Sequence, residues 1–399
     1  MSTINKRINR SGQECYYIRS SCGSDTDNKR IRKSLIYTPT PGMTKRQIEK
    51  EVARQAVLFE EKLNHGFILD ENIKFSDYAK LWLENSKPNL APITYVRYAT
   101  LLVRINQEIG HLKLSKIQSM HLKEFYKNLG DITSEKTGKK LSQQTIKHYH
   151  RCISAILGTA TKESLIPRNV ASKSYMDGPK VPRKEPLHLN DEEARQFVEV
   201  LMQEKDIRIK AALSLLIYSG VRNGELGGLE WQDIDFANNT IHVARASQWV
   251  KGYGMITKNP KNETSNRTIK LSPTVFLILT DYKRWYQQQK LLNGDRWKKS
   301  NRLFIQNNGS AITPGTINSW LKSFIKAHQL PYVTPHSMRH TFCTLLIANG
   351  VDIRTVSAKA GHSRTSTTLD IYTHALKSSD ELASKVLDDL LTPKLKKIQ

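Results

Sequence analysis

The sequence predicts a multidomain, mainly helical chain. It would comprise a small β-sheet-plus-helix N-terminal domain, an all-α second domain, and a mainly-α (α+β) third domain with a small antiparallel sheet. β-branched and aromatic residues are concentrated in the first 37 positions, which is typical of strands. Apolar residues then recur at helical spacing as far as residue 175. A proline-rich stretch at 176–188 sets off a third region, and 399 residues are enough for two or three domains.

The charge of the chain indicates a polyanionic partner. Its 62 lysines and arginines against 37 acids give a formal net charge of +25. Basic side chains that neutralise phosphates release condensed counterions, so this excess favours nucleic acid over a merely solubilising surface. No apolar run approaches the roughly 18 residues of a membrane span, and the N-terminus lacks the apolar core of a secretory signal. We therefore expect a cytoplasmic protein with no membrane partner.

Cysteine and carboxylate patterns bear on metal binding. The four cysteines, at positions 15, 22, 152 and 343, are scattered and form no C-x-x-C pair. This usage fits a reducing compartment and argues against structural zinc. Asp233 and Asp235 could suggest a metal-binding carboxylate pair, but no third acid stands in a comparable motif, so we interpret them as turn residues. We expect no metal and no cofactor.

The first region is basic and strand-like. Strands are predicted at 16–19 and 30–37, and residues 1–37 hold eight lysines and arginines against three acids. A helix follows, in which Thr44 and Gln47 form a capping box ahead of one apolar stripe. The region is either a nucleic-acid-binding module or a structural, protein-binding one.

The second region is predicted to be all helical. Its helices span Phe75 to Trp82, begin at Pro92, span Leu122 to Leu129, and begin at Ser142. Basic residues lie between the apolar positions of the last helix. That pattern is typical either of a helix that packs on one side and faces phosphates, or of a solvated charged face.

A basic, proline-rich linker is predicted at 176–188, because proline interrupts both helices and strand ladders. Its charge would suit a strap across a nucleic-acid backbone. Asn190 caps the next helix, where the third domain begins. At the other end of the chain, the tail 379–399 carries Leu382, Val386 and Leu390 on one helical face.

The stretch from Thr334 to Tyr372 holds the residues with the clearest chemistry. Thr334 and Pro335 predict a helix start, and His336 and Arg339 share the face of its first turn. Free backbone N–H groups and the helix dipole favour an anion there. His362 follows Gly361, and Tyr372 comes ten residues later. Alone, each is commonly a capping or core residue; together they suit a phosphodiester with tyrosine as nucleophile.

These residues resemble the signature of the tyrosine recombinase (phage integrase) family, which reads H-x-x-R, then G-H, then a tyrosine about ten residues on. The flanking residues also match, as in Gly361-His362-Ser363 and Asp370-Ile371-Tyr372-Thr373-His374. Ala360 stands where the family commonly has leucine. The run from Ser219 through Arg222 to Asp235 resembles the family's first arginine box, with Glu225 in reach to orient the Arg222 guanidinium. Gly227 and Gly228 are unusual in what should be a helix.

The family's catalytic lysine lies on a β-hairpin, in the pattern P-K-T followed by S-x-R-T-I. Ile241 and Val243 predict one strand, and Ile269 and Leu271 predict another. Pro260-Lys261 and Ser265-Asn266-Arg267-Thr268-Ile269 keep the family's register. The resemblance therefore implies Lys261 as the catalytic lysine, with Lys258 as its competitor.

The resemblance implies a site-specific recombinase that integrates and excises a mobile element, such as a phage, genomic island or conjugative transposon. Tyr372 would attack phosphorus and form a covalent 3′-phosphotyrosine. Arg222 and Arg339 would stabilise the transition state, and Lys261 would protonate the departing 5′ oxygen. The histidines would add donors and help to take the phenol's proton; they are His336 and His362. Because guanidiniums supply the positive charge, no magnesium is required.

The resemblance also implies the roles of the domains. These would be an arm-type DNA-binding domain at 1–68, a core-binding (SAM-like) helical domain at 72–175, a basic linker at 176–188, a catalytic domain at 189–378, and a C-terminal helical tail at 379–399. The tail would dock on a neighbouring protomer or fold back on its own domain. Expected partners are double-stranded DNA with core and arm attachment sites, a homotetramer in the synaptic complex, an excisionase and a host DNA-bending protein, on the bacterial nucleoid.

Two other enzyme classes and one binding protein compete with this interpretation. A type IB topoisomerase shares the nucleophile and the cations, but would relax supercoils without paired sites. A transposase with a carboxylate triad would demand a divalent metal. A non-catalytic DNA-binding regulator would keep the charge and the helices without needing the full set of site residues.

Overall fold

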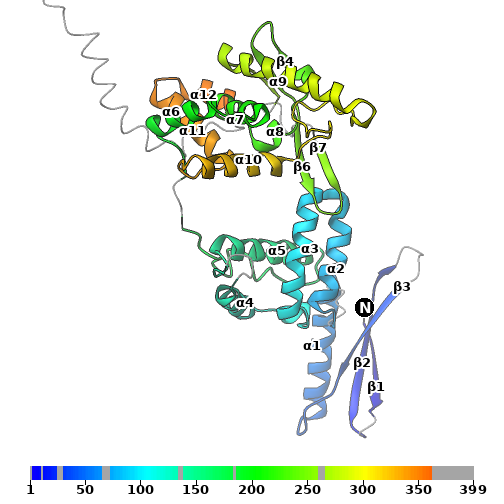
Figure 1. Ribbon diagram of the computed structural model, residues 1–399. Helices are drawn as coiled ribbons and strands as arrows, with labels where there is room; N and C mark the ends of the chain where they lie inside the picture. The colour runs from blue at the N-terminus through cyan, green and yellow to red at the C-terminus, as the bar shows by residue number, and fades with distance from the viewer. Residues whose placement is uncertain are drawn as a thin grey trace, which may run out of the picture. The chain divides into compact units, whose positions relative to one another are not determined.

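The computed structural model describes residues 2–9, 12–24, 30–64, 72–133, 138–182, 186–258 and 266–361. The chain divides into two compact units, Met1–Arg183 and Lys184–Gln399. The described parts are mainly helical with small antiparallel sheets, as predicted (Figure 1). None of the helices described is long and apolar enough to cross a membrane.

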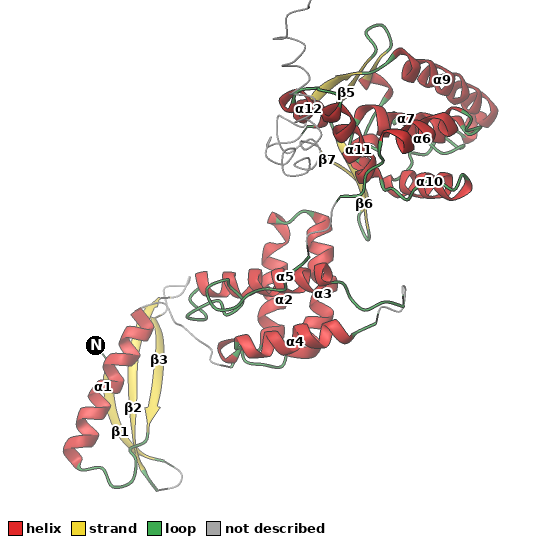
Figure 2. Cartoon of the chain, turned by 90° about the vertical axis from the view of Figure 1, so that its left-hand side faces the viewer, coloured by secondary structure: helices red, strands yellow, loops and turns green. Residues whose placement is uncertain are grey.

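The chain begins with a three-stranded antiparallel sheet in the order β1-β2-β3. The strands are β1 (Thr3–Ile8), β2 (Glu14–Ser24) and β3 (Arg30–Tyr37). Helix α1 (Lys45–Asn64) lies along this sheet (Figure 2). It packs there because Ile18 of β2 is buried against Val52 and Ala56. The predicted capping box is confirmed, since the Thr44 backbone N–H donates to Gln47 Oε1 at 2.9 Å.

In the described remainder of the first unit, four α-helices share one core, as predicted. They are α2 (Phe75–Ser86), α3 (Pro92–Ile109), α4 (Ser119–Asp131) and α5 (Gln143–Lys162). Polar side chains also join α2 to α5: Tyr78 Oη donates to Glu163 Oε2 at 2.7 Å, and Trp82 Nε1 donates to Thr159 Oγ1 at 3.0 Å. The predicted cap is confirmed, because Ser142 accepts from the backbone N–H of Thr145.

The second unit is built around one buried helix. Its helices are α6 (Asp191–Met202), α7 (Ile207–Ser219), α8 (Asn223–Leu226), α9 (Pro273–Asn293), α10 (Pro314–Ala327), α11 (Pro335–Ala348) and α12 (Ile353–Ala360). Helix α7 contacts α6, α9, α10 and α11 (Figure 1). Its residues Ala211 to Leu216 are 0% exposed. Burial of each large apolar side chain contributes roughly 1.5–3 kcal/mol to stability, so α7 is held firmly in the core.

A three-stranded sheet lies beside these helices. Its strands are β4 (Ile234–Asp235), β5 (Thr240–Val243) and β8 (Arg267–Lys270), in the order β4-β5-β8. The predicted pairing strands are β5 and β8, with Ile241 opposite Ile269. A separate two-stranded hairpin, β6 (Ala246–Val250) and β7 (Gly254–Lys258), stands between them in the sequence and was not predicted.

The helix expected over Gly227 and Gly228 is wrong. Helix α8 is four residues long and ends before Gly227. A Cβ at Gly228 would lie 2.8 Å from the carbonyl oxygen of Arg245, so the residue permits close approach of that backbone. Asp235 is a turn residue as interpreted, because its Oδ1 accepts from the backbone N–H groups of Ala237 and Asn238.

Gly220 is the turn on which the end of α7 depends. It has a left-handed φ of +61°, and a Cβ there would overlap the Phe342 ring. Gly220→Ala should therefore cost backbone strain of about 1–2 kcal/mol plus overpacking of about 1–3 kcal/mol. Gly252→Ala is the matched control, since its φ is +81° and nothing lies within 4 Å of the new Cβ. Urea denaturation followed by circular dichroism measures both, and equal losses of stability would contradict the packing argument.

Candidate active site

Helix α11 presents two of the predicted site residues in its first turn. Thr334 caps it, accepting from the backbone N–H of Ser337 at 3.1 Å, and Pro335 is its first residue, as predicted. His336 and Arg339 follow one turn apart. Burial of the imidazole, then the charges of Arg339 and Arg222, lower the pKa of His336. The ring is therefore neutral at neutral pH and able to accept a proton.

Arg339 is a buried guanidinium with unused donor capacity. Its side chain is 2% exposed, and Nη1 donates to the carbonyl oxygen of Gly220 at 2.8 Å. Nη2 is buried and has no hydrogen-bond partner among the residues described. Burial and the nearby Arg222 charge lower the pKa of Arg339 to about 10, which leaves it protonated at neutral pH. A buried cation with a free donor is costly, so this position favours an anionic ligand.

Arg222 stands two residues beyond the Gly220 turn. It is the N-cap of α8, and its backbone N–H and Nη1 donate to the two Glu225 carboxylate oxygens at 2.9 and 2.7 Å. Its Nη2 donates to the carbonyl oxygen of Gly361 at 2.7 Å. The side chain stays 42% exposed, so the guanidinium is held in place while one side faces solvent.

Glu225 orients Arg222, and it does so from a buried position. Its side chain is 6% exposed, so the pair is not an ordinary surface ion pair. Burial would raise the pKa of Glu225, but the hydrogen bond and charge of Arg267, and then those of Arg222, hold it below its ordinary value. The carboxylate is thus ionised at neutral pH.

Arg267 is also a site residue, although in the sequence it serves only to fix the register of the family's lysine pattern. Its Nη2 donates to Glu225 Oε2 at 2.9 Å, and its Nε donates to the carbonyl oxygen of Lys359 at 2.7 Å. One signal could have found it. Residues two apart share a face of a strand, so Arg267 is on the same face of β8 as the buried Ile269.

His340 is a second residue that was missed. It lies one turn beyond His336, with the two ring centroids 4.3 Å apart in an edge-to-face arrangement. It is buried, and burial, followed by the charges of His336, Arg339 and His188, lowers its pKa to about 4. His340 is therefore neutral at pH 7, and its ring buttresses one side of His336.

The structure brings together four of the predicted residues, Arg222, Glu225, His336 and Arg339, which influence one another's charge states. The others, Lys261, His362 and Tyr372, lie outside the described residues, as does the tail 379–399. The competing lysine, Lys258, is described: it ends β7, opposite Ala246.

The described cluster suits an oxyanion. Its three arginines (222, 267 and 339) against one carboxylate (225) leave an excess of two positive charges. Guanidiniums offer forked, permanently charged donors that match phosphate oxygens. The described ranges hold no group of three or more His, Cys, Asp or Glu that could bind a metal ion.

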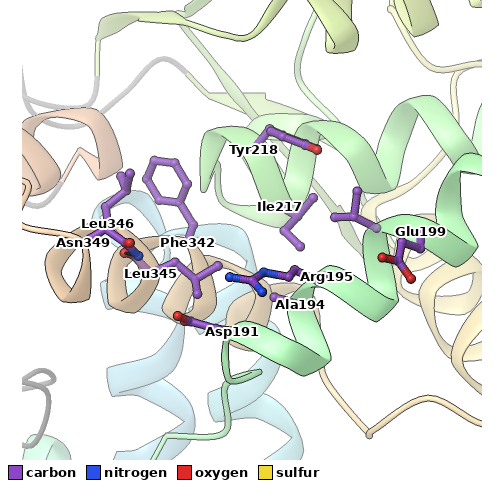
Figure 3. A pocket seen from close by; sticks show the side chains of 11 residues that line it. Asp191, Ala194, Arg195, Glu199, Ile217, Tyr218, Phe342, Leu345, Leu346 and Asn349 are labelled. Atoms are coloured by element: carbon purple, nitrogen blue, oxygen red, sulfur yellow. Dashed lines mark hydrogen bonds between the residues drawn. The ribbon is translucent and has the colours of Figure 1, made fainter.

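An apolar pocket of about 540 Å³ lies on another part of this unit, between α6, α7 and α11 (Figure 3). Phe342, Leu345 and Leu346 of α11 line it together with Ile217 and Tyr218 of α7. The pocket lining does not include Arg222, Glu225, Arg267 or Arg339, so the pocket is separate from the candidate site.

Two family models match this chain. The model described as "Phage integrase family" matches residues 188–379, and "Phage integrase, N-terminal SAM-like domain" matches residues 74–130. The first spans the second unit's described site, and also Lys261, His362 and Tyr372.

Curated relatives point the same way. "Tyrosine recombinase XerC-like" of Caldanaerobacter subterraneus subsp. tengcongensis is 28% identical over 96% of this chain and 97% of its own. "ICEBs1 integrase" of Bacillus subtilis is 26% identical over 94% and 97%. "Tyrosine recombinase XerA" of Pyrococcus furiosus is 30% identical over 53% of this chain and 67% of its own.

Solved structures share the fold. A Tn1549 transposon integrase in complex with a circular intermediate DNA has a TM-score of 0.64 at 22% identity, covering 79% of this chain and 99% of that one. A lambda integrase tetramer bound to a Holliday junction has a TM-score of 0.53 at 15% identity, covering 91% and 94%.

The unsatisfied Arg339 gives a prediction about stability. Arg339→Met removes a buried charge but also the hydrogen bond to the Gly220 carbonyl, so these opposing effects should change the free energy of unfolding by no more than about 1–2 kcal/mol. Wild-type protein should be stabilised by inorganic sulfate more than this variant, because an anion that binds only the folded state raises the Tm. Arg284→Met, on an exposed arginine of α9, is the control. Equal sulfate-induced Tm shifts in all three proteins would refute anion binding at Arg339.

Proposed function

We propose, for a chain that belongs to the phage integrase family of tyrosine recombinases, that the cluster of Arg222, Glu225, His336 and Arg339 binds the DNA phosphate undergoing strand exchange. The protein is a site-specific recombinase, an enzyme that breaks and rejoins DNA strands. Family membership supports this function and not the topoisomerase or regulator alternatives.

One observation carries the proposal: the guanidiniums of Arg222 and Arg339 lie in the same cluster, and each can still donate to a further acceptor. Nη2 of Arg339 is unpartnered within the described ranges, and Arg222 remains 42% exposed beside it. Attack on a phosphodiester places extra negative charge on the non-bridging oxygens of a pentacoordinate transition state. Fixed donors aimed at that charge stabilise the transition state without reorganising, which is the most effective form of electrostatic catalysis.

The proposed reaction begins with Tyr372. Its phenol loses a proton to a neutral histidine, His336 or His362, and its oxygen forms a bond to phosphorus. The bond from phosphorus to the 5′ oxygen breaks, and Lys261 supplies the proton that this oxygen needs. The product is a 3′-phosphotyrosine and a free 5′ hydroxyl. Because the ester keeps the energy of the phosphodiester, a new 5′ hydroxyl can reverse the steps without ATP.

The domain roles are proposals as well. We assign arm-site binding to residues 1–68, core-site binding to 72–175, a basic linker to 176–188, catalysis to 189–378, and docking between or within protomers to the tail 379–399. Support for the first assignment comes from the sheet face opposite α1. There, Arg7 lies over the Tyr17 ring at 5.0 Å, and Arg19 is exposed two residues along β2. A basic sheet face with aromatic residues fits a DNA groove.

The proposed assembly is a homotetramer on double-stranded DNA carrying core and arm sites. Support comes from the lambda integrase structure, which is a tetramer bound to a Holliday junction. Integration and excision of a mobile element is supported by relatives named for ICEBs1 and for the transposon Tn916. We further propose an excisionase and a host DNA-bending protein as partners, on the nucleoid.

The nucleophile is tested by Tyr372→Phe. A nicked suicide substrate lets the cleaved end diffuse away, so the covalent adduct accumulates and is read as a shifted band on a denaturing gel. We expect the variant to bind DNA with unchanged affinity and to form no detectable adduct, since phenylalanine has no hydroxyl group with which to form the ester. An adduct of wild-type yield in this variant would sink the proposed mechanism.

The lysine assignment is tested with a modified leaving group. Lys261→Ala should slow cleavage of ordinary DNA by about 10²–10⁴-fold, the typical contribution of a general acid. A substrate with sulfur at the 5′ bridging position leaves as a thiolate that needs no proton, so on it the variant should approach the wild-type rate. Lys258→Ala is the matched control and should cleave both substrates normally. If Lys258→Ala is instead the variant that sulfur rescues, the two lysines exchange roles.

A further inference from the structure

Arg267 connects three elements that are distant in the sequence. It lies on β8, where it is paired with Val243 of β5, and its side chain is 8% exposed. Nη2 reaches the carboxylate of Glu225 on α8, 42 residues away. Nε reaches the carbonyl oxygen of Lys359 in the last turn of α12, 92 residues away. No other arginine in the described part of the second unit bridges α8 to α12 from a strand.

Gly361 fits against this arginine. It ends α12 with a left-handed φ of +68°, and a Cβ there would lie 2.7 Å from Arg267 Nη1. Glycine is therefore required here for two reasons: the left-handed backbone conformation, and the close approach of the Arg267 guanidinium. Its own carbonyl oxygen accepts from Arg222 Nη2.

Two guanidiniums thus hold the carboxyl end of α12, and one carboxylate holds both guanidiniums. Arg267 binds the Lys359 carbonyl and Arg222 binds the Gly361 carbonyl, while Glu225 accepts hydrogen bonds from both. Positive charge is favoured at a helix C-terminus, where carbonyl groups lack partners. The residue that follows this clamp in the sequence is His362.

We propose that Arg267 is a positioning residue for strand exchange, which holds the Glu225 carboxylate against Arg222 and the carboxyl end of α12 against the arginine box. It acts on the DNA phosphate through Arg222 rather than by touching the phosphate itself. The inference rests on the proposed function of Arg222.

The charges around Glu225 explain what the loss of Arg267 would do. Within the described ranges the carboxylate faces Arg222 on its own element, Arg267 on β8 and the more remote Arg339 on α11, whereas α12 contributes backbone carbonyl groups. Burial raises the pKa of Glu225, and Arg267 is the strongest influence that opposes this. Without Arg267, the pKa should rise, and a protonated Glu225 would hold Arg222 less firmly.

Loss of Arg267 should give cleavage a distinctive pH dependence. In the wild-type protein the pKa of Glu225 is below its ordinary value of 4.5, so its titration leaves cleavage unaffected at about pH 5.5–8.5. In Arg267→Gln, the largest influence that opposes burial is lost, so the pKa of Glu225 should rise toward this range. The cleavage rate should then fall up to tenfold per pH unit below that pKa, on top of a loss on the order of 10²-fold at neutral pH from the misplaced Arg222.

The experiment measures single-turnover cleavage of the nicked suicide substrate against pH, together with DNA affinity and thermal stability. The variants are Arg267→Gln, Arg267→Lys, Glu225→Gln and the double variant Arg267→Gln with Glu225→Gln. We expect unchanged DNA affinity, a new acid limb in Arg267→Gln only, and no such limb once Glu225 is also replaced. Arg267→Lys should keep the wild-type pH profile but recover only part of the rate, because lysine cannot donate in two directions as a planar fork.

Arg208→Gln is the matched control. Arg208 also forms a two-pronged pair with a carboxylate, Asp206, in the same unit. Arg208 lies near the start of α7, at the opposite end from the Gly220 turn and about 18 Å from it along the helix at 1.5 Å per residue. It should lose stability without gaining an acid limb, so it separates a general loss of folding from a loss of positioning.

Three results would overturn the inference: a wild-type rate in Arg267→Gln, an equal loss at every pH, or an acid limb in Arg208→Gln as well. Should Arg267→Gln fail to fold, Arg267→Lys decides, since a wild-type rate there refutes the two-way clamp and a reduced rate with intact folding supports it. If the wild-type adduct does not depend on Tyr372, the proposed function itself fails. If it does depend on Tyr372 while Arg267 proves neutral, only this inference fails.

Discussion

The carboxylate of Glu225 accepts hydrogen bonds from two arginines on different elements, and the organisation of the site depends on it. A buried charge is tolerated only when partners replace the lost water, so Arg222 and Arg267 must both be in place for Glu225 to stay ionised. Through those arginines, one side chain determines where β8, α8 and the end of α12 meet. The site is therefore a single electrostatic unit, and its members cannot be exchanged independently.

Several features that lower the stability of the fold lie in this region, and packing in the rest of the second unit compensates for them. Arg339 is buried with an unpartnered Nη2 in the described structure, and Arg222 and Arg267 share one acidic partner, Glu225. Gly220 holds a left-handed turn against the Phe342 ring. The buried helix α7 ends at that turn, and its apolar contacts supply the stability that lets the site stay short of negative charge. Such unsatisfied charge is typical of sites that bind their missing partner, which supports the proposed binding of an oxyanion.

Local patterns predicted much of the fold because they depend on neighbours in the sequence. The caps at Thr44, Ser142 and Thr334 are confirmed, and so are the strands that became β5 and β8. Spacing also identified His336 and Arg339, which share one helical turn. The helix expected over Gly227 was wrong, because the approach of the Arg245 backbone to Gly228 is invisible to periodicity. The hairpin β6–β7 was not predicted, because buried and exposed residues alternate only weakly along its two strands.

The sequence by itself determined the chemistry of the site: its cationic residue types, their helix-start placement and their match to one family's signature. Only the tertiary structure decided how they are held. Arg267 reaches Lys359 across 92 residues, and Arg222 reaches Gly361 across 139. Contacts at such separations follow from how layers pack, and no repeat of 2 or 3.6 residues encodes them. Gly361 could be read as a helix stop from its neighbours, but its contact with the Arg267 guanidinium exists only once β8 and α12 lie together.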